Sequence, residues 1–98
     1  MNKFGDLIRT KREEQEMLLR HLSAQLDMDT AMLSKIERGE KVAKKEHVKQ
    51  LANIFKLDFN ELIALWLADK VFLLVANEEQ ALQAIHIAEE QVKSISKN

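Results

Sequence analysis

Four residues in the first half of this chain have types and spacing suited to binding through hydrogen bonds, charge and a small apolar contact. A helix that begins near Thr30 places them on one face, because the α-helix repeats every 3.6 residues. They are Thr30, Ala31, Ser34 and Lys35, a short, adaptable and partly basic set. The apolar residues of the same segment turn inward: Met32, Leu33 and Ile36. The segment therefore combines an exposed polar face with a buried apolar one.

The flanking residues indicate where this helix begins and ends. Asp29 can cap it by accepting from free N–H groups, and Gly39 can take the positive φ that ends a helix. A preceding helix shares one apolar face, made of Leu19, Leu22 and Leu26. Two short helices joined by a tight turn outline a helix-turn-helix, which is typical of DNA readers. The same outline also fits two packed helices of an all-α domain that does not bind DNA.

Residues that could support catalysis or hold a metal are few. The three histidines, His21, His47 and His86, fall on three different predicted helices. No zinc-protease motif, glycine-rich phosphate loop or serine-hydrolase motif occurs. Cysteine is absent, which excludes disulfides, thiolate metal sites and a cysteine nucleophile. We expect a protein that is not an enzyme and that needs no metal, cofactor or small-molecule ligand.

Composition predicts an all-α fold. The chain has 98 residues, enough for one domain, with no proline and two glycines. Its first residues lack the apolar segment of a signal peptide, so a cytoplasmic location is expected. Residues 62–76 are apolar nearly all round, but they are too few for a membrane span and Asp69-Lys70 interrupts them. We expect no membrane association.

Charge is unevenly distributed along the chain. The net charge is −1, yet residues 1–50 carry 11 Lys/Arg and 9 Asp/Glu, whereas residues 51–98 carry 4 and 7. Between Lys35 and Lys49 there are six basic and three acidic residues. Cations therefore gather at and just after the exposed face of residues 30–35, where they suit an anionic partner. An ordinary solvated helix face gives the same pattern.

Periodicity and capping residues predict the elements that position this face. A helix from Lys3 to about Glu14 precedes the helix-turn-helix, and a helix from Lys45 to Phe55 follows it. The next boundary lies at residues 57–60, with Asp58 or Asn60 as the cap.

Two further predicted helices have apolar surfaces that must pack against another part of the protein or a second copy. Residues 62–76 are apolar on every side, and Asn77 to Gln80 resemble a capping box that starts a last helix. In that helix Ala81, Ile85, Ala88, Val92 and Ile95 form a narrow seam of coiled-coil type. We expect a homodimer interface at Leu65, Trp66, Phe72, Ile85, Ala88 and Val92. The alternative is an intramolecular hairpin that completes the core of a monomer.

Four segments together form a specific pattern: LIRTKRE, LRHLSAQL, LSKIERG and VKQLANIFKLDFNEL. With them the chain resembles the Xre family, the Cro and phage-repressor type of helix-turn-helix domain, over about residues 4–69. The resemblance implies a lambda-repressor-like, all-α domain of about five helices plus a C-terminal helix. We expect the DNA-binding domain at residues 1–69 and a helical extension for dimerisation, packed on the same core, at residues 70–98.

The resemblance also implies roles for individual residues. The positions of Thr30, Ala31, Ser34 and Lys35 face the major groove in the family. There Lys35 can donate to guanine O6 or N7, Ser34 can bond a base or a phosphate, and the other two can touch a thymine methyl. Candidates for phosphate contact are Arg20, Arg38, Lys41 and Lys44. Arg12 matches an arginine that pairs with the glutamate matching Glu37, although each alone resembles a surface charge.

Three positions depart from the family pattern. Leu19 stands where many members have a glutamine that bonds phosphate, so we expect that contact to be absent or to move to Arg20. Asp27 stands at the usual turn glycine, and Ala43 replaces the usual proline after the second helix of the motif. Residues 30–37 contain no Gln, Asn or Arg, the commonest bidentate base contacts. Specificity is therefore expected to be modest or to depend on DNA shape.

The function that the resemblance implies is a homodimeric, sequence-specific regulator that represses transcription from a palindromic operator in double-stranded DNA. The alternative is a protein-binding module that holds a toxin, an antirepressor or another regulator through the apolar C-terminal helices. In that case DNA binding is secondary. Replacement of Lys35 or Ser34 distinguishes the two, because only the first function requires them.

Overall fold

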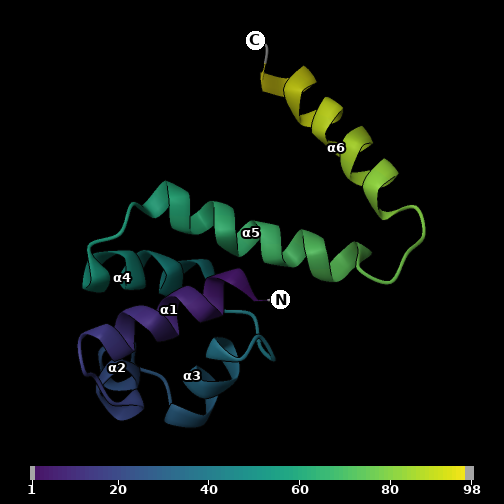
Figure 1. Ribbon diagram of the computed structural model, residues 1–98. Coiled ribbons are helices and arrows are strands. Elements are labelled where there is room, and N and C mark those ends of the chain that lie inside the picture. Colours follow the sequence, from purple (N-terminus) through teal and green to yellow (C-terminus); the bar gives the residue numbers. More distant parts are fainter. Residues whose placement is uncertain (1, 97–98) are drawn as a thin grey trace.

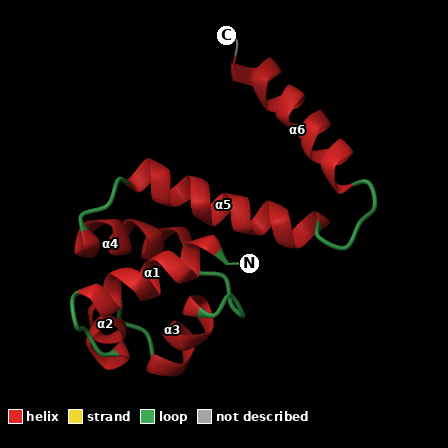
Figure 2. Cartoon of the chain, in the orientation of Figure 1, coloured by secondary structure: helices red, strands yellow, loops and turns green. Residues whose placement is uncertain are grey.

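The computed structural model describes residues 2–96, which form six α-helices and no strand (Figures 1 and 2). The helices are α1 (Lys3–Glu14), α2 (Leu19–Gln25), α3 (Thr30–Glu37), α4 (Lys45–Phe55), α5 (Phe59–Val75) and α6 (Ala81–Ser96). The predicted all-α class is confirmed, as are the predicted bounds of α1 and α4 and the start of α3.

Helices begin and end at capping and turn residues, largely where the sequence predicts. The Asp29 carboxylate accepts from Met32 N–H at 2.7 Å and caps α3, and the Asp58 carboxylate accepts from Glu61 N–H at 3.1 Å and caps α5. Gly39 has a φ of +78° after α3, as its type predicts. Asp27 has a φ of +53° in the turn between α2 and α3, a left-handed conformation that Asp tolerates better than most residues.

Helices α1 to α5 enclose one hydrophobic core. Its largest fully buried members include Ile8, Leu22, Leu33, Val48, Leu51 and Leu62. They come from all five helices, so each helix depends on the others to cover its apolar face. The core holds α2 and α3 against α1 at one end, while α4 and α5 close the other (Figure 1).

The start of α1 lies against the end of α3. The Asn2 amide donates from Nδ2 to the Glu37 carbonyl at 2.7 Å, and its Oδ1 accepts from Gly5 N–H at 3.2 Å. A Cβ on Gly5 would lie 2.6 Å from the carbonyl oxygens of Ile36 and Glu37, a distance that real Cβ atoms do not show. Glycine is therefore required at position 5 because two backbones meet there.

Helix α5 fastens two other parts of the domain. The buried Trp66 indole donates from Nε1 to the Ala43 carbonyl at 2.8 Å, which ties the loop after α3 to α5. The Asp69 carboxylate accepts from Lys3 N–H at 3.1 Å and from Phe4 N–H at 2.9 Å, so α5 caps the start of α1. Lys70 Nζ lies 3.5 Å from the centroid of the Trp66 ring, within the range of a cation–π contact.

Helix α6 projects away from the other five (Figure 1). It buries none of its residues and begins at Ala81. The capping box predicted at Asn77 is therefore wrong, because two hydrogen-bonded turns occupy the segment before α6. In them Glu78 N–H donates to the Val75 carbonyl at 2.9 Å, and Ala81 N–H donates to the Glu78 carbonyl at 3.3 Å. The first helical acceptor is the backbone carbonyl of Gln80.

The expected division at residues 69 and 70 falls inside the continuous helix α5. The two domains expected from the sequence also include residues 1, 97 and 98, which lie outside the described residues. Among the described helices, none has the length and apolar character needed to cross a membrane.

Replacement of Gly5 by alanine tests the contact between α1 and α3. The new Cβ must displace backbone atoms, so we expect Gly5→Ala to lower the free energy of unfolding by about 2 kcal/mol. Thr10→Ala, at an exposed position of the same helix, is the control and should change it by less than about 0.5 kcal/mol. Urea unfolding measures both. Equal stability of the two variants would contradict this close contact.

Candidate nucleic-acid interface

Helix α3 presents the four residues on which the sequence analysis centred. Thr30, Ala31 and Lys35 are exposed and Ser34 is half-buried, whereas Leu33 and Ile36 are buried. We call the set of Thr30, Ala31, Ser34 and Lys35 the α3 face. Helix α3 therefore has the polar side and the apolar side that its sequence predicts.

A hydroxyl pair connects the start of α3 to α2. Ser23 is buried, and its Oγ donates to the Arg20 carbonyl at 3.3 Å and lies 3.3 Å from Thr30 Oγ1. Because the single Ser23 proton is directed to the carbonyl, the Thr30 hydroxyl is the donor in this pair. The methyl group of Thr30 then remains for contact with an apolar partner. This pair was not predicted from the sequence, although Ser23 carries a hydroxyl on a helix otherwise packed through leucines.

A buried ion pair holds the end of α3 to α1. Arg12 donates from Nε to Glu37 Oε2 at 2.8 Å and from Nη2 to Glu37 Oε1 at 3.1 Å, a bidentate geometry. Its remaining nitrogen, Nη1, donates to the Met17 carbonyl at 2.8 Å. Glu37 is buried, and its hydrogen bonds raise the pKa of Arg12 above the ordinary arginine value. The structure thus forms the pair that the family resemblance implied.

Of the four cations expected to contact phosphates, the structure places Lys41 beside the α3 face. Arg20, Arg38, Lys41 and Lys44 are all exposed. Lys41 lines one shallow hollow together with Ala31 and Lys35, so the structure brings it beside the α3 face. Lys44 directly precedes α4, and Arg38 directly follows α3 with its guanidinium 3.3 Å from Glu40. Arg20 lies on α2, the first helix of the motif.

A larger hollow of about 450 Å³ lies beside α3. Its apolar wall includes Met28, Met32 and Ile36, and Lys41, Lys44 and His47 also line it. His47 Nδ1 is buried and has no hydrogen-bond partner among the described residues. This hollow could not be predicted from the sequence, because its walls come from the turn before α3, from α3 itself, from the loop after it and from the start of α4.

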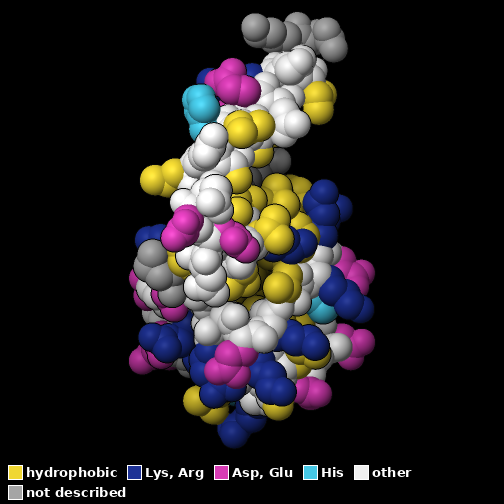
Figure 3. Space-filling model, turned by 90° about the vertical axis from the view of Figure 1, so that its right-hand side faces the viewer, with side chains coloured by type: hydrophobic (Ala, Val, Ile, Leu, Met, Phe, Trp, Pro, Cys, Tyr) yellow, Lys and Arg dark blue, Asp and Glu magenta, His cyan; other side chains and the backbone are white. Residues whose placement is uncertain are grey.

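The residues expected at a dimer interface lie in two different environments. Phe72, Ile85, Ala88 and Val92 are exposed and Leu65 is half-buried, but Trp66 packs inside the core of its own domain. Figure 3 shows hydrophobic side chains gathered where α5 and α6 meet, with charged side chains over the rest of the domain. The exposed and half-buried members remain candidates for an interface, and we leave Trp66 out of it.

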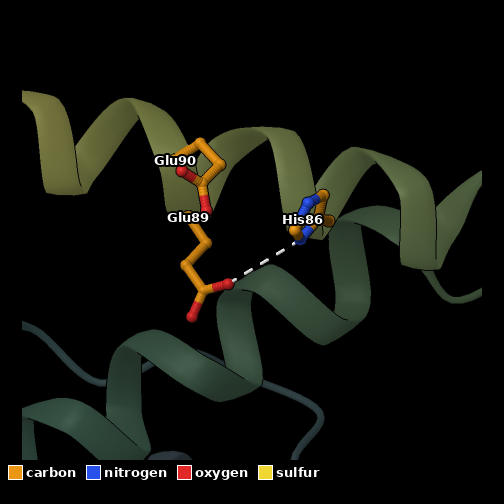
Figure 4. A group of neighbouring side chains, drawn as sticks. All are labelled: His86, Glu89 and Glu90. Carbon is orange, nitrogen blue, oxygen red and sulfur yellow. Dashed lines mark ion pairs between the residues drawn. The ribbon is translucent and has the colours of Figure 1, made fainter.

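One group of possible metal ligands lies on α6. His86, Glu89 and Glu90 place one ligand atom each within 4.8 Å of one another, and His86 Nδ1 lies 3.9 Å from Glu89 Oε1 (Figure 4). All three side chains are exposed. Neighbouring residues of an exposed helix face commonly form such groups without a metal, and among residues 2–96 no buried ligand or second helix completes this one.

The fold and the α3 face together define a helix-turn-helix DNA-binding domain: two short helices joined by a tight turn, the second carrying an exposed face with Lys35 on it and Lys41 beside it. Comparison with protein families agrees, because a family model described as helix-turn-helix matches residues 8–62. The chain belongs to the Xre and Cro type of helix-turn-helix proteins, which are DNA-binding regulators of transcription. No curated protein and no solved structure matched the chain.

Loss of the ion pair should destabilise the domain strongly. Arg12→Ala leaves the buried Glu37 carboxylate without its partner, so we expect the free energy of unfolding to fall by about 3 kcal/mol. Arg12→Lys should recover only part of this loss, because an ammonium cannot reproduce the bidentate geometry. Urea unfolding measures the effect.

The matched control is Arg9→Ala, which removes an exposed pair with Glu13 at 4.0 Å. It should cost less than about 0.5 kcal/mol. If Arg12→Ala were no more destabilising than Arg9→Ala, the buried pair would contribute nothing to the position of α3.

Proposed function

We propose that this regulator is a sequence-specific repressor that binds a palindromic operator as a homodimer and blocks transcription by occupying a promoter. The observation that supports it best is the α3 face, which is exposed, polar and flanked by cations. Contacts at both ends of α3 hold this face in place: the hydroxyl pair at Thr30 and the ion pair at Glu37. A helix held in this way can enter the major groove without reorganisation.

Within the proposed complex the residues have separate tasks. Lys35 donates to guanine O6 or N7, and Ser34 bonds a base or a phosphate. Thr30, whose hydroxyl is engaged with Ser23, and Ala31 offer methyl groups to thymine. Arg20, Arg38, Lys41 and Lys44 contact phosphates, which position the domain but carry no sequence information. Because the α3 face has one long donor side chain, we also assign part of the specificity to DNA shape.

The homodimer follows from the geometry of such operators. A two-fold axis relating two copies places two α3 helices about one DNA turn apart, roughly 34 Å, so the operator is palindromic. Large exposed apolar residues on α5 and α6 supply a surface for this association. The same surface also favours a second candidate, a module that binds another protein. The two candidates differ in one requirement: the repressor needs the α3 face to bind DNA, whereas the protein-binding module does not.

Replacement of Lys35 tests base recognition. The probe is the duplex upstream of the protein's own coding region, compared with a scrambled duplex by fluorescence anisotropy. We expect Lys35→Ala to weaken binding to the upstream duplex about 5- to 100-fold and binding to the scrambled duplex much less. Lys93→Ala on α6 removes the same charge away from the α3 face and should change neither.

If Lys35→Ala and Lys93→Ala bound the upstream duplex equally well, the α3 face would not read that DNA. If the unaltered dimer did not prefer the upstream duplex to the scrambled one, the protein-binding module would become the better proposal.

Lys44→Ala separates phosphate contacts from base contacts. Loss of the Lys44 ammonium group should weaken binding to both duplexes by a similar factor, because phosphates are the same in every sequence. We expect the slope of log affinity against log salt to decrease by about 1, since one fewer phosphate is neutralised. Titrations at several salt concentrations measure the slope, and Lys93→Ala is again the control. An unchanged slope would remove Lys44 from the proposed contacts.

A further inference from the structure

We propose that two copies of the chain exchange their C-terminal helices, so that α6 of each copy packs on the exposed apolar side of α5 in the other. This inference rests on the proposed homodimer and specifies which surfaces form it. It differs from a pairing of α6 with α6, and from a pairing of α5 with α5, because the contact joins unlike helices and occurs twice.

The first observation is that α6 has an apolar side without a cover in its own chain. Its seam consists of Ala81, Ile85, Ala88, Val92 and Ile95, and the helix buries none of them. The exposed fraction of the large seam residues rises along the helix, from 39% at Ile85 to 62% at Val92 and 76% at Ile95. Helix α6 therefore touches its own chain only near its start and diverges from it afterwards, as Figure 1 shows.

The second observation is a matching uncovered side on α5. The first half of α5 is anchored in the core by Leu62 and Trp66, but Leu67, Val71 and Leu74 are 48%, 45% and 80% exposed. These three residues recur at four and three positions, so they lie on one face of the helix. The charged residues between Leu67 and Leu74 are Asp69, which caps α1, and Lys70, whose Nζ lies over the Trp66 ring. No charged residue occurs between Val71 and Ala76. The face has the length and the composition to receive another apolar helix.

The connection between the two helices explains why one chain cannot bring these sides together as it stands. The five residues from Ala76 to Gln80 form two hydrogen-bonded turns, which direct α6 away from α5. Helix α6 would need a different connection to fold back over Leu67 and Val71. A second copy can provide the missing helix without any change in this segment.

The exposed area of the chain is consistent with a dimer interface of the usual size. A compact monomer of 11.3 kDa exposes about 5,700 Å². This chain exposes 7235 Å², an excess of about 1,500 Å² over that expectation. Its radius of gyration is 15.3 Å, whereas a compact chain of this length has about 12.6 Å. Burial of the excess in both copies amounts to roughly 3,000 Å², within the range of obligate homodimers.

Symmetry favours exchange over pairing of like helices. A two-fold interface repeats each contact, so α6 on α5 of the other copy is matched by the reverse contact. Both uncovered sides are then buried by a single arrangement. Pairing of α6 with α6 alone would leave Leu67 and Val71 exposed, and pairing of α5 with α5 alone would leave the α6 seam exposed.

Cross-linking in the full-length chain tests the exchange, because the sequence contains no cysteine and an introduced thiol is the only one. Val71→Cys on α5 and Val92→Cys on α6 are prepared separately, one of them with a size tag. They are mixed under conditions that allow subunits to exchange, then treated with a short bismaleimide. We expect the α5-to-α6 product between differently sized chains to predominate, and each variant alone to cross-link at least about 10-fold less.

The other outcomes have distinct meanings. Predominant Val92→Cys to Val92→Cys products, or Val71→Cys to Val71→Cys products, would overturn the exchange and leave the proposed dimeric repressor intact. A monomeric mass in sedimentation with no cross-link would overturn both the exchange and the dimer. Binding of the upstream duplex, measured on the same samples, reports separately on the DNA-binding function.

A second variant tests the α6 seam without engineered thiols. Val92→Glu should weaken dimerisation by about 100-fold or more, because the dimer would bury two unpaired carboxylates. The monomer should stay folded, since Val92 is largely exposed in its own chain. Emission from the single tryptophan, which lies in the core, checks this. Gln83→Glu, an exposed change on the same helix, should leave the dimer intact. Equal dimerisation by both variants would exclude the seam from the interface.

Discussion

The ion pair between Arg12 and Glu37 is the contact on which the position of the α3 face depends. Helix α3 spans only Thr30 to Glu37, and a helix of that length is marginal in water without tertiary support. Its start is held by the Thr30 hydroxyl on Ser23, and its end by the carboxylate of Glu37 and the Asn2 amide on the Glu37 carbonyl. These contacts do not involve the side chains of Ala31, Ser34 and Lys35, so the domain holds the α3 face in place mainly through contacts on its buried side.

Helix α5 links that surface to the part of the chain that carries α6. One turn of α5 contains Trp66, which holds the loop after α3, and Asp69, which caps α1. The next turns carry the exposed apolar residues. A single helix therefore contributes to the core at its beginning and to the uncovered surface at its end, with no linker between them. The boundary expected at residue 69 therefore does not coincide with a loop or linker, because it lies within α5.

Much of the fold was predictable because its signals are local. The amphipathic period located α1 and α4, and the short side chains of Asp29 and Asp58 located two helix starts. Contacts between distant residues were not accessible in this way. Arg12 and Glu37 were paired only through the family resemblance, and Asp69 gave no sign that it would cap a helix 65 residues earlier. Trp66 was expected at an interface because a segment that is apolar on every side has no period to show which side faces the core.

Because α5 is continuous, the relative orientation of the two α3 helices in the proposed dimer depends on the helical rotation between the two ends of α5. Each residue of an α-helix turns the chain by about 100° and advances it by about 1.5 Å. The residues between Trp66 and Leu74 therefore act as a rigid segment. Their number sets the rotation about the helix axis between the side chains buried in the core and those exposed at the end of α5. One residue more or fewer after Asp69 would keep the contacts of Trp66 and Asp69 with the rest of the domain. In the proposed dimer it would nevertheless turn the two α3 helices out of alignment with a common DNA groove. In the proposed dimer, the number of residues in one helix is thus a determinant of operator spacing.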